Sequence, residues 1–343
     1  MKKIFLIFFL LLVFIGLLIF VAWNFFVRGP IPVPLAKSSL IYAEDSKISP
    51  LGNAVLYKDK GFLYLYNLQT KIQKKLIELP EGNDYDYAVS PTLDKYVVSL
   101  SYTSISDAVT GVEIPSKVTI YDIQNNVVQE TQKNYFSIDS IQWSPNGKFI
   151  GYLFSDGGWN GPTKLVIFDD DLHELDSYNL GQIYDNEERT KGFAFSAESS
   201  SFIFSDDIAN PQPNNNIYSF NRFYTGNLIE NKIQDVNLVG SVEGGGYIRG
   251  ISWNTDGIFF GYRFKLYKIT LPDKKIYYSD NWSLSDLSKK NTCNTNADTS
   301  NFVGLFENQI VAERNFWYGC DFIVRKSHQL YLNNLPSDWL EKE

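Results

Sequence analysis

The sequence predicts an all-β protein, a β-propeller of about six four-stranded blades preceded by one N-terminal transmembrane helix. A unit of strand, tight turn and strand recurs along the chain, and a second apolar hairpin follows most copies. The first 27 residues contain a long uncharged apolar run. Aromatic residues make up 16% of the chain, and helical periodicity is nearly absent after residue 28, which agrees with a β-rich domain.

Residues 4–27 form the predicted transmembrane helix, with one amide at Asn24 and no charge. At 1.5 Å per residue this helix is about 36 Å long, enough to cross a hydrocarbon core of about 30 Å. Trp23 suits the aromatic belt at a membrane interface. A cleaved secretory signal is the alternative. The run is longer than a usual signal core, and bulky residues occupy the place of a small-residue cleavage site, so a retained anchor is favoured.

The flanks of this helix predict its orientation. Lys2 and Lys3 precede it, and Arg28 alone follows closely. The positive-inside rule therefore places residues 1–3 in the cytoplasm and the large domain on the extracytoplasmic side. Residues 28–37 are a Pro-rich linker, which predicts a short, stiff spacer between membrane and domain.

The domain beyond the anchor is acidic. Three of the 31 Lys and Arg residues precede residue 29, so 28 remain against 39 Asp and Glu, a net charge of −11. Such a surface repels phosphate backbones, and no basic cluster offsets it. We therefore expect no nucleic-acid partner.

An internal repeat predicts the propeller. Its clearest copy is residues 141–152, in which Ser144-Pro145-Asn146-Gly147 separates two apolar strands. Proline and glycine supply the fixed and positive φ values that a hairpin turn needs. Successive copies are 41, 54, 52 and 58 residues apart when measured between these anchor residues: Ser49, Ser90, Ser144, Ser196 and Asn254. Four strands in about 50 residues are typical of a propeller blade.

Six such units account for residues 38–335, followed by a C-terminal tail at 336–343. Modest shifts of the boundaries allow five or seven blades. We expect the last unit to hold four strands of its own, at these ranges: 302–306, 309–315, 320–326 and 329–333. A pair of β-sandwiches is the alternative fold, but it does not explain the recurrence.

The run Trp143-Ser144-Pro145-Asn146-Gly147-Lys148-Phe149-Ile150 and its weaker copies resemble the WD-type repeat of TolB-like β-propellers. The resemblance covers residues 40–335 and implies the fold rather than an activity. The chain departs from TolB itself, because no separate α/β domain precedes the repeats and a membrane anchor replaces the cleaved signal.

The sequence offers no catalytic constellation, and we expect no cofactor and no metal. The two histidines, His173 and His328, are far apart, and close His or Cys ligand spacings are absent. Neither a Gly-x-Ser-x-Gly elbow nor a nucleotide phosphate loop occurs. The acidic runs at 169–171 and 84–86 offer oxygen ligands for calcium, but acidic turns are far commoner than calcium sites.

Two aromatic segments are the candidate binding residues. Glycines and a proline surround Trp159 and Asn160 and predict an exposed recognition loop. A second such loop is expected at Phe316, Trp317 and Tyr318. Aromatic side chains can stack on a sugar or anchor a protein partner. The alternative is that they pack against a neighbouring blade.

Cys293 and Cys320 both lie far beyond the anchor, where a disulfide is permitted. A bridge would close a loop of 27 residues and contribute about 3 kcal/mol in the chain-entropy model. Two unpaired buried thiols are the alternative, and spacing leaves both open.

The leading functional hypothesis is a membrane-anchored, extracytoplasmic propeller that binds or scaffolds an envelope protein or a glycan. The alternative is a propeller-type enzyme, such as a hydrolase, lactonase or cyclase, with a carboxylate or metal site at the central channel. Convergence of acidic side chains at one mouth of that channel would favour the enzyme.

Overall fold

The computed structural model describes residues 39–79, 84–101, 116–133, 137–155, 163–179, 192–211, 217–243, 248, 250–262, 265–280, 297–307, 309–320 and 323–342. Every regular element in these ranges is a β-strand, and no helix among them is long and apolar enough to cross a membrane. The predicted anchor at 4–27 and the linker at 28–37 lie outside the described residues, so both stay predictions.

The first half of the chain forms three four-stranded blades. Blade 1 consists of β2 (Glu44–Ile48), β3 (Ala54–Asp59), β4 (Phe62–Asn67) and β5 (Gln73–Glu78). Blade 2 consists of β6 (Asp84–Val89), β7 (Lys95–Ser101), β8 (Ser116–Asp122) and β9 (Val127–Lys133). Blade 3 consists of β10 (Ser137–Trp143), β11 (Phe149–Ser155), β12 (Thr163–Asp169) and β13 (Glu174–Asn179).

The second half forms three more blades. Blade 4 consists of β14 (Phe193–Phe195), β15 (Ser201–Pro211), β16 (Ile217–Ile229) and β17 (Lys232–Glu243). Blade 5 consists of β18 (Ile251–Asn254), β19 (Gly257–Tyr262), β20 (Lys265–Ile269), β21 (Ile276–Ser279) and the short β25 (Leu340–Glu341). Blade 6 consists of β22 (Ala297–Phe306), β23 (Gln309–Cys320), β24 (Ile323–Asn334) and β1 (Ser39–Tyr42).

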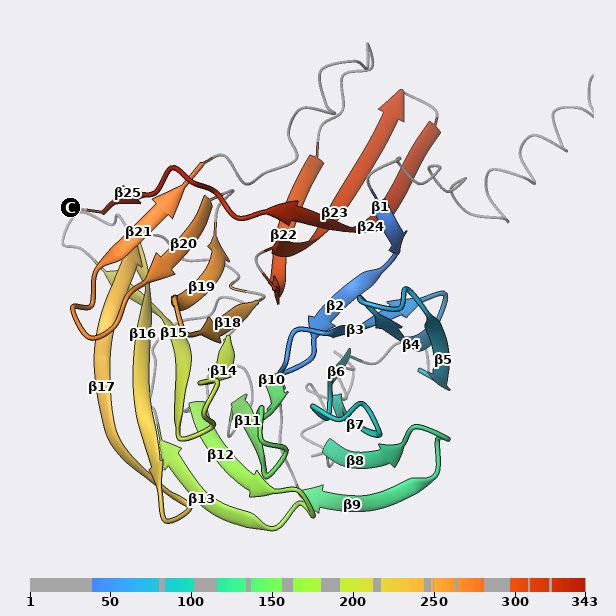
Figure 1. The fold of residues 1–343 in the computed structure, drawn as a ribbon, viewed down its shortest axis with the longest axis horizontal. Helices are drawn as coiled ribbons and strands as arrows, with labels where there is room; N and C mark the ends of the chain where they lie inside the picture. The colour runs from blue at the N-terminus through green and yellow to red at the C-terminus, as the bar shows by residue number, and fades with distance from the viewer. Residues whose placement is uncertain are drawn as a thin grey trace, which may run out of the picture.

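The six blades are arranged in a ring, with the first strand of each nearest the axis (Figure 1). Neighbouring strands within each blade are antiparallel, and the first strands of adjacent blades contact one another around the axis. The predicted all-β propeller with six four-stranded blades is therefore confirmed.

The ring closes because strands from the two ends of the domain form one sheet, blade 6. The fourth strand of blade 6 is the N-terminal β1, which pairs antiparallel with β24. The expectation of four C-terminal strands in this blade is therefore wrong. Residues 323–326 and 329–333, which were expected in two separate strands, lie in the single strand β24, and the loop expected at 316–318 is part of β23.

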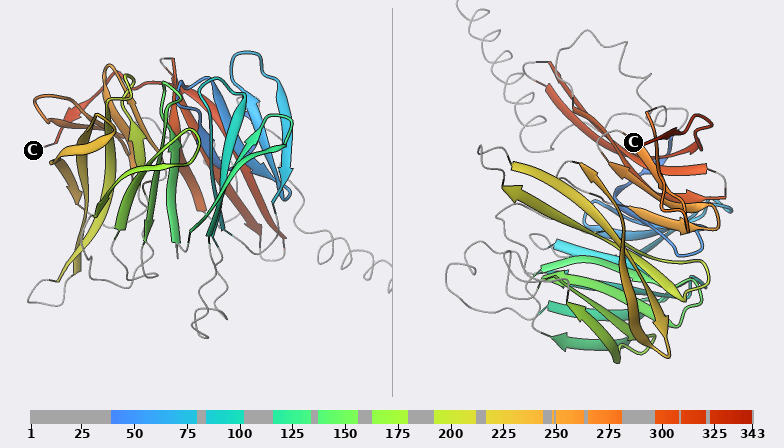
Figure 2. Two further views of the ribbon diagram at one scale, coloured as in Figure 1. Left: turned by 90° about the horizontal axis from the view of Figure 1, so that it is seen from below. Right: turned by 90° about the vertical axis from the view of Figure 1, so that its left-hand side faces the viewer.

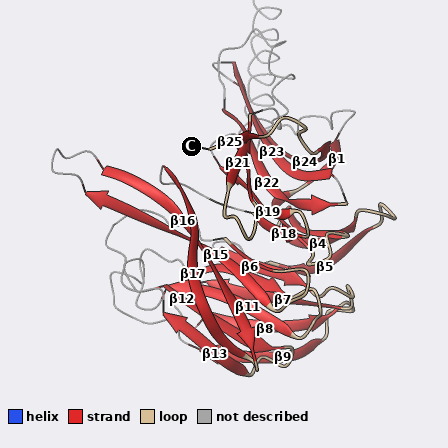
Figure 3. Cartoon of the chain, turned by 60° about the vertical axis from the view of Figure 1, so that its left-hand side comes forward, coloured by secondary structure: helices blue, strands red, loops and turns tan. Residues whose placement is uncertain are grey.

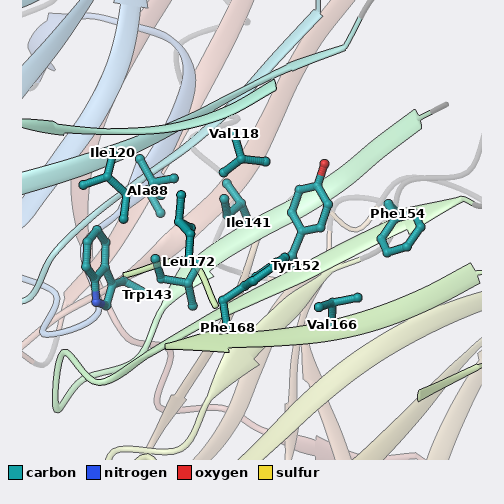
Figure 4. Close-up of a cluster of buried hydrophobic side chains, with 12 residues drawn as sticks. Ala88, Val118, Ile120, Ile141, Trp143, Tyr152, Phe154, Val166, Phe168 and Leu172 are labelled. Atoms are coloured by element: carbon teal, nitrogen blue, oxygen red, sulfur yellow. The ribbon is translucent and has the colours of Figure 1, made fainter. Parts of the chain in front are cut away.

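Apolar side chains fill the space between neighbouring blades. Figure 4 shows the cluster between blades 2 and 3, in which Trp143, Tyr152 and Phe168 pack beside residues of β6 and β8. Blade 4 approaches blade 3 so closely that a Cβ on Gly151 would lie 2.2 Å from the Phe193 ring. At about 25 cal/mol per Å² of buried apolar area, such aromatic contacts are the main force that holds blades together.

Four of the five repeat anchors are buried serines that fix the turn between the first and second strands of a blade. In each turn the serine Oγ accepts a hydrogen bond from the backbone N–H five residues later, at 2.9–3.2 Å. These serines are Ser49, Ser90, Ser144 and Ser196. The repeat seen in the sequence is therefore a repeated hydrogen-bonded turn.

The residue three positions after each serine adopts a positive φ of 60–74°. Glycine occupies this position at Gly52 and Gly147, as the turn prediction required, while Leu93 and Ser199 occupy it in the other two blades. A leucine or serine in the left-handed region is strained, and it persists because the surrounding hydrogen bonds determine the turn. The serine is thus a more constant feature of the motif than the glycine.

Candidate functional site

The strand order gives the ring two different faces. The connections from first to second strand and from third to fourth strand meet at one face, which we call the turn face. The connections from second to third strand and from blade to blade meet at the other, which we call the connection face. Within the described chain the turn face carries short hydrogen-bonded turns, seen along one edge of the molecule in Figure 2 (left).

The turn face is tied together across blades. The backbone N–H of Asn146 in blade 3 donates to the Oγ of Ser199 in blade 4, at 2.9 Å. A Cβ on Gly52 in blade 1 would lie 2.4 Å from the carbonyl oxygen of Leu305 in blade 6. The turns therefore pack closely enough around the axis to leave little freedom for substitution.

The outer turns of this face are organised by carboxylate and amide caps. Asp122 accepts hydrogen bonds from the backbone and side chain of Asn126, and Asn67 accepts from the N–H groups of Gln69 and Thr70. The hydrogen bonds from Asn126 lower the pKa of the Asp122 carboxyl. These polar groups complete turns in their own chain.

The acidic run at 169–171 is a turn of this kind. Asp169 accepts hydrogen bonds from the N–H groups of Asp171 and His173, and its other oxygen lies 3.0 Å from the His173 ring. Partial burial raises the pKa of the Asp169 carboxyl, but the hydrogen bonds from His173 and Asp171 outweigh it and lower the pKa overall. Across the described part of the chain, no group of three or more His, Cys, Asp and Glu residues is placed to hold a metal ion.

Two strand extensions lie at the connection face. The β15–β16 hairpin continues to the pair Pro211 and Ile217, whereas β17 pairs with β16 only as far as Phe220. The ribbon projects beyond its neighbours in Figure 3. In blade 6, β23 and β24 pair as far as Cys320 and Ile323, whereas β1 covers only the opposite half of β24.

Of the predicted binding residues, the structure describes only those at 316–318. Trp159 and Asn160 belong to the connection between β11 and β12, which lies outside the described residues. Phe316, Trp317 and Tyr318 lie in the extended part of β23, where their backbones pair with residues 325–327 of β24. The prediction of a loop at 316–318 is therefore wrong. Aromatic residues pair well across strands, and this pairing outweighs the loop preference of the glycine at 319. Their binding role stays a prediction.

Of the two cysteines in the predicted disulfide, the structure describes only Cys320. Cys320 is the last residue of β23 at the connection face, and Cys293 lies outside the described residues. The pairing therefore stays a prediction.

A buried polar network links the first strands of blades 1, 2 and 3. The Nζ of Lys47 in β2 lies 3.0 Å from one oxygen of Asp86 in β6, and the other Asp86 oxygen accepts a hydrogen bond from the N–H of Ile141 in β10 at 2.6 Å. The Asp86 side chain is only 9% exposed. Because a buried carboxylate requires a cation and donors, this arrangement binds three blades at once.

A second set of contacts joins blade 1 to its neighbours on both sides. Glu313 in blade 6 accepts a hydrogen bond from the N–H of Ser46 at 2.8 Å, and the Tyr87 hydroxyl in blade 2 donates to the Asp45 carbonyl at 2.5 Å. Burial, followed by the charges of Asp45, Asp86, Glu313 and Glu44, raises the pKa of Tyr87 well above its usual value. Tyr87 therefore remains a neutral hydrogen-bond donor throughout the physiological range.

This network was not among the sites expected from the sequence. In the sequence Asp86 belongs to the acidic run at 84–86. Its partner Lys47 lies in β2 (Glu44–Ile48), which is mainly polar, so no local pattern marks either residue as part of a network. Only the ring closure shows that Glu313, more than 260 residues from Ser46, contacts the same blade.

These features define the chain as a six-bladed β-propeller with a polar network near its axis. Solved structures with a similar arrangement include the β-propeller domain of the trilobed protease from Pyrococcus furiosus (11% identity, 88% of this chain and 97% of that chain, TM-score 0.41). Another is a putative TolB from Agrobacterium tumefaciens (12% identity, 86% and 91%, TM-score 0.39). A third is a chain of a nidogen/laminin complex (8% identity, 81% and 96%, TM-score 0.45).

These similarities are distant, and the propeller assignment rests on the sheet topology of this chain. No protein-family model matches the sequence. No curated protein matches it either.

Proposed function

We propose that this protein is a non-enzymatic binding or scaffolding propeller, and that it engages a protein or a glycan through its connection face. Residues 4–27 anchor it in a membrane, with residues 1–3 in the cytoplasm and the propeller on the extracytoplasmic side. The anchor rests on the uncharged apolar run, and the orientation rests on the basic residues around it.

The contrast between the two faces carries this proposal. At the turn face, described carboxylates and hydroxyls such as Asp169 and Ser144 bond to turns of their own chain. At the connection face, blades 4 and 6 extend their strands past their neighbours, and the second of these extensions contains Phe316, Trp317 and Tyr318. Recognition surfaces commonly combine such aromatic anchors with connections on a rigid scaffold.

The polar network near the axis agrees with a structural role. The two Asp86 oxygens are engaged by Lys47 and by a backbone N–H. A general base or a nucleophile needs a free lone pair directed at substrate. Asp86 instead bridges blades.

Partner capture by the full-length protein in detergent tests the proposal. Wild type, Trp317→Ala, Trp159→Ala and a turn-face control, Gln124→Ala, would be crosslinked in membrane fractions and also applied to a glycan array. We expect a partner or glycan that wild type and Gln124→Ala retain and that at least one tryptophan variant loses by tenfold or more, which is about 1.4 kcal/mol. Equal retention by all four proteins would contradict recognition at the connection face.

The membrane arrangement has its own test. Intact cells or spheroplasts would be treated with a protease, and the propeller would be followed by an antibody. We expect the propeller to be degraded from outside while the protein stays in the membrane fraction after alkaline washing. Protection of the propeller in intact cells, or its release by alkali, would contradict this arrangement.

The alternative function is a propeller-type enzyme with a carboxylate or metal site at the central channel. One observation favours it: four acidic residues are close enough to Tyr87 for their charges to raise its pKa, in addition to burial. These residues are Asp45, Asp86, Glu313 and Glu44. Metal analysis of the purified protein and hydrolase, lactonase and cyclase assays on wild type and Asp86→Asn would distinguish it. Retained metal, or an activity that Asp86→Asn abolishes without unfolding the protein, would replace the binding proposal.

A further inference from the structure

The last residues of the chain leave blade 6 and run back to blade 5. β24 ends at Asn334, and β25 then pairs with β21 as a fifth strand on the outer edge of blade 5. Figure 1 shows this dark red segment crossing from β24 to lie beside β21. The segment 335–342 therefore spans the junction between blades 5 and 6.

Its apolar side chains pack on both blades. Leu335 and Trp339 contact a buried cluster made of residues from blade 5 and blade 6. This cluster consists of Phe259, Leu266, Phe302, Leu305, Ile310 and Ala312. The Trp339 ring meets Phe259 edge-on, with ring centroids 6.0 Å apart. Trp339 therefore caps the apolar seam between the two blades.

Polar contacts hold the segment along blade 5. Leu340 and Glu341 pair with Tyr278 and Tyr277, and the N–H of Lys342 donates to the carbonyl of Ile276 at 2.8 Å. Two side-chain contacts accompany this pairing, from Lys275 to Glu341 at 2.8 Å and from Ser279 to Asp338 at 3.2 Å. The backbone pairing occupies the outer edge of β21.

The segment also reaches blade 4. The Nζ of Lys342 donates to the carbonyl of Ser241 in β17, at 2.9 Å. Burial lowers the pKa of Lys342, against a smaller opposing effect of Glu243. A partly buried ammonium bonded to a backbone carbonyl is a fixed end rather than a loose terminus.

We propose that residues 335–342 form a C-terminal latch that fastens blade 6 to blade 5, independently of β1. Blade 6 contributes only three strands of its own, and β1 adds a fourth of four residues from the far end of the chain. β1 holds one side of blade 6, and the latch holds the other side by joining it to blades 5 and 4. Its release loosens the ring between blades 5 and 6 while blades 1–3 stay folded.

Truncation of the full-length protein tests the latch. We would compare wild type, a protein lacking 336–343 and a control lacking only residue 343, by thermal unfolding and by hydrogen exchange of peptides. Removal of 336–343 should lower Tm by roughly 5 °C and speed exchange in β18–β22, with blades 1–3 unchanged. Unchanged exchange, or an equal increase in all six blades, would overturn the proposal.

A point variant covers the case in which the truncated protein does not fold. Trp339→Ala removes the side chain that caps the seam, whereas Leu340→Ala, at a side chain that is 53% exposed, keeps the strand pairing. We expect faster exchange in β18–β22 for Trp339→Ala alone. Identical exchange in these two variants would also overturn the latch.

Discussion

The two faces of the propeller use polar residues in different ways. At the turn face, Ser49, Ser90, Ser144 and Ser196 repeat one hydrogen bond in four blades, and Asp122 and Asp169 close the outer turns. At the connection face, the blades differ from one another: β15–β16 and β22–β24 are extended, and β3–β4 ends in a two-residue turn. The repeat is thus preserved at the turn face and varies at the connection face.

This difference predicts that substitutions at the turn face reduce stability more than substitutions at the connection face. Loss of a hydrogen bond made by a buried serine hydroxyl leaves its donor without that partner, which costs stability. A residue at a projecting strand end costs little when it is changed, unless a partner uses it. The same substitution is therefore expected to have different effects at the two faces.

Alanine at two glycines with the same backbone conformation should show the largest contrast. Gly52 at the turn face has φ +73°, and a Cβ there would lie 2.4 Å from the Leu305 carbonyl oxygen. Gly61 at the connection face has φ +79°, and its nearest neighbour would be 4.0 Å away. Chemical denaturation should show that Gly52→Ala loses about 3 kcal/mol, the sum of backbone strain and overpacking, and that Gly61→Ala loses about 1 kcal/mol. Equal losses would show that close packing does not distinguish the faces.

Removal of a repeat serine should have the next largest effect. Ser144→Ala deletes the acceptor of the Phe149 N–H and the donor to Asn146, and both hydrogen bonds are made by a buried serine hydroxyl. We expect a loss of about 2 kcal/mol in the free energy of unfolding. Ser177→Ala, at an exposed position of the edge strand β13, is the matched control and should change stability by less than about 0.5 kcal/mol. A Ser144→Ala protein as stable as the control would mean that the turn needs only its backbone.

Acid should have the smallest effect, through the capping carboxylates. The pKa of Asp169 is lowered in the folded protein, so its stabilising contribution is present above the unfolded pKa and is lost as pH falls through the folded value. Tm measured from pH 6 to pH 3 should therefore fall less steeply for Asp169→Asn than for wild type. Asp170→Asn, at the exposed neighbour, should follow wild type. An equal decrease of Tm in all three proteins would show that Asp169 does not contribute to the loss of stability in acid.

The repeat was predictable because it depends on local chemistry. Ser144, Pro145 and Gly147 specify a turn through their own φ preferences and hydrogen bonds, so the repeated strand-turn-strand unit follows from neighbouring residues. The last blade was predicted less well. The sequence around 316–328 contains aromatic residues and a glycine that indicate a loop, but pairing between β23 and β24 keeps both segments extended.

The candidate site was less predictable, because its contacts join distant parts of the chain. Trp317 was selected for its residue type, and its binding role remains to be tested by partner capture. Lys47 and Asp86 are 39 positions apart in the sequence, and they meet because consecutive first strands lie side by side around the axis. No local pattern specifies such a pair.

The sequence by itself determined an apolar segment at 4–27, an acidic domain and a repeat that folds into blades, since each depends on composition or on residues within one turn of one another. The tertiary structure alone decided how the ring closes. β1 completes blade 6, Glu313 reaches Ser46, and residues 335–342 cross to blade 5. The first two contacts arise because the curvature of all six blades brings the two ends of the domain together, and the third arises because blades 5 and 6 are neighbours in the ring.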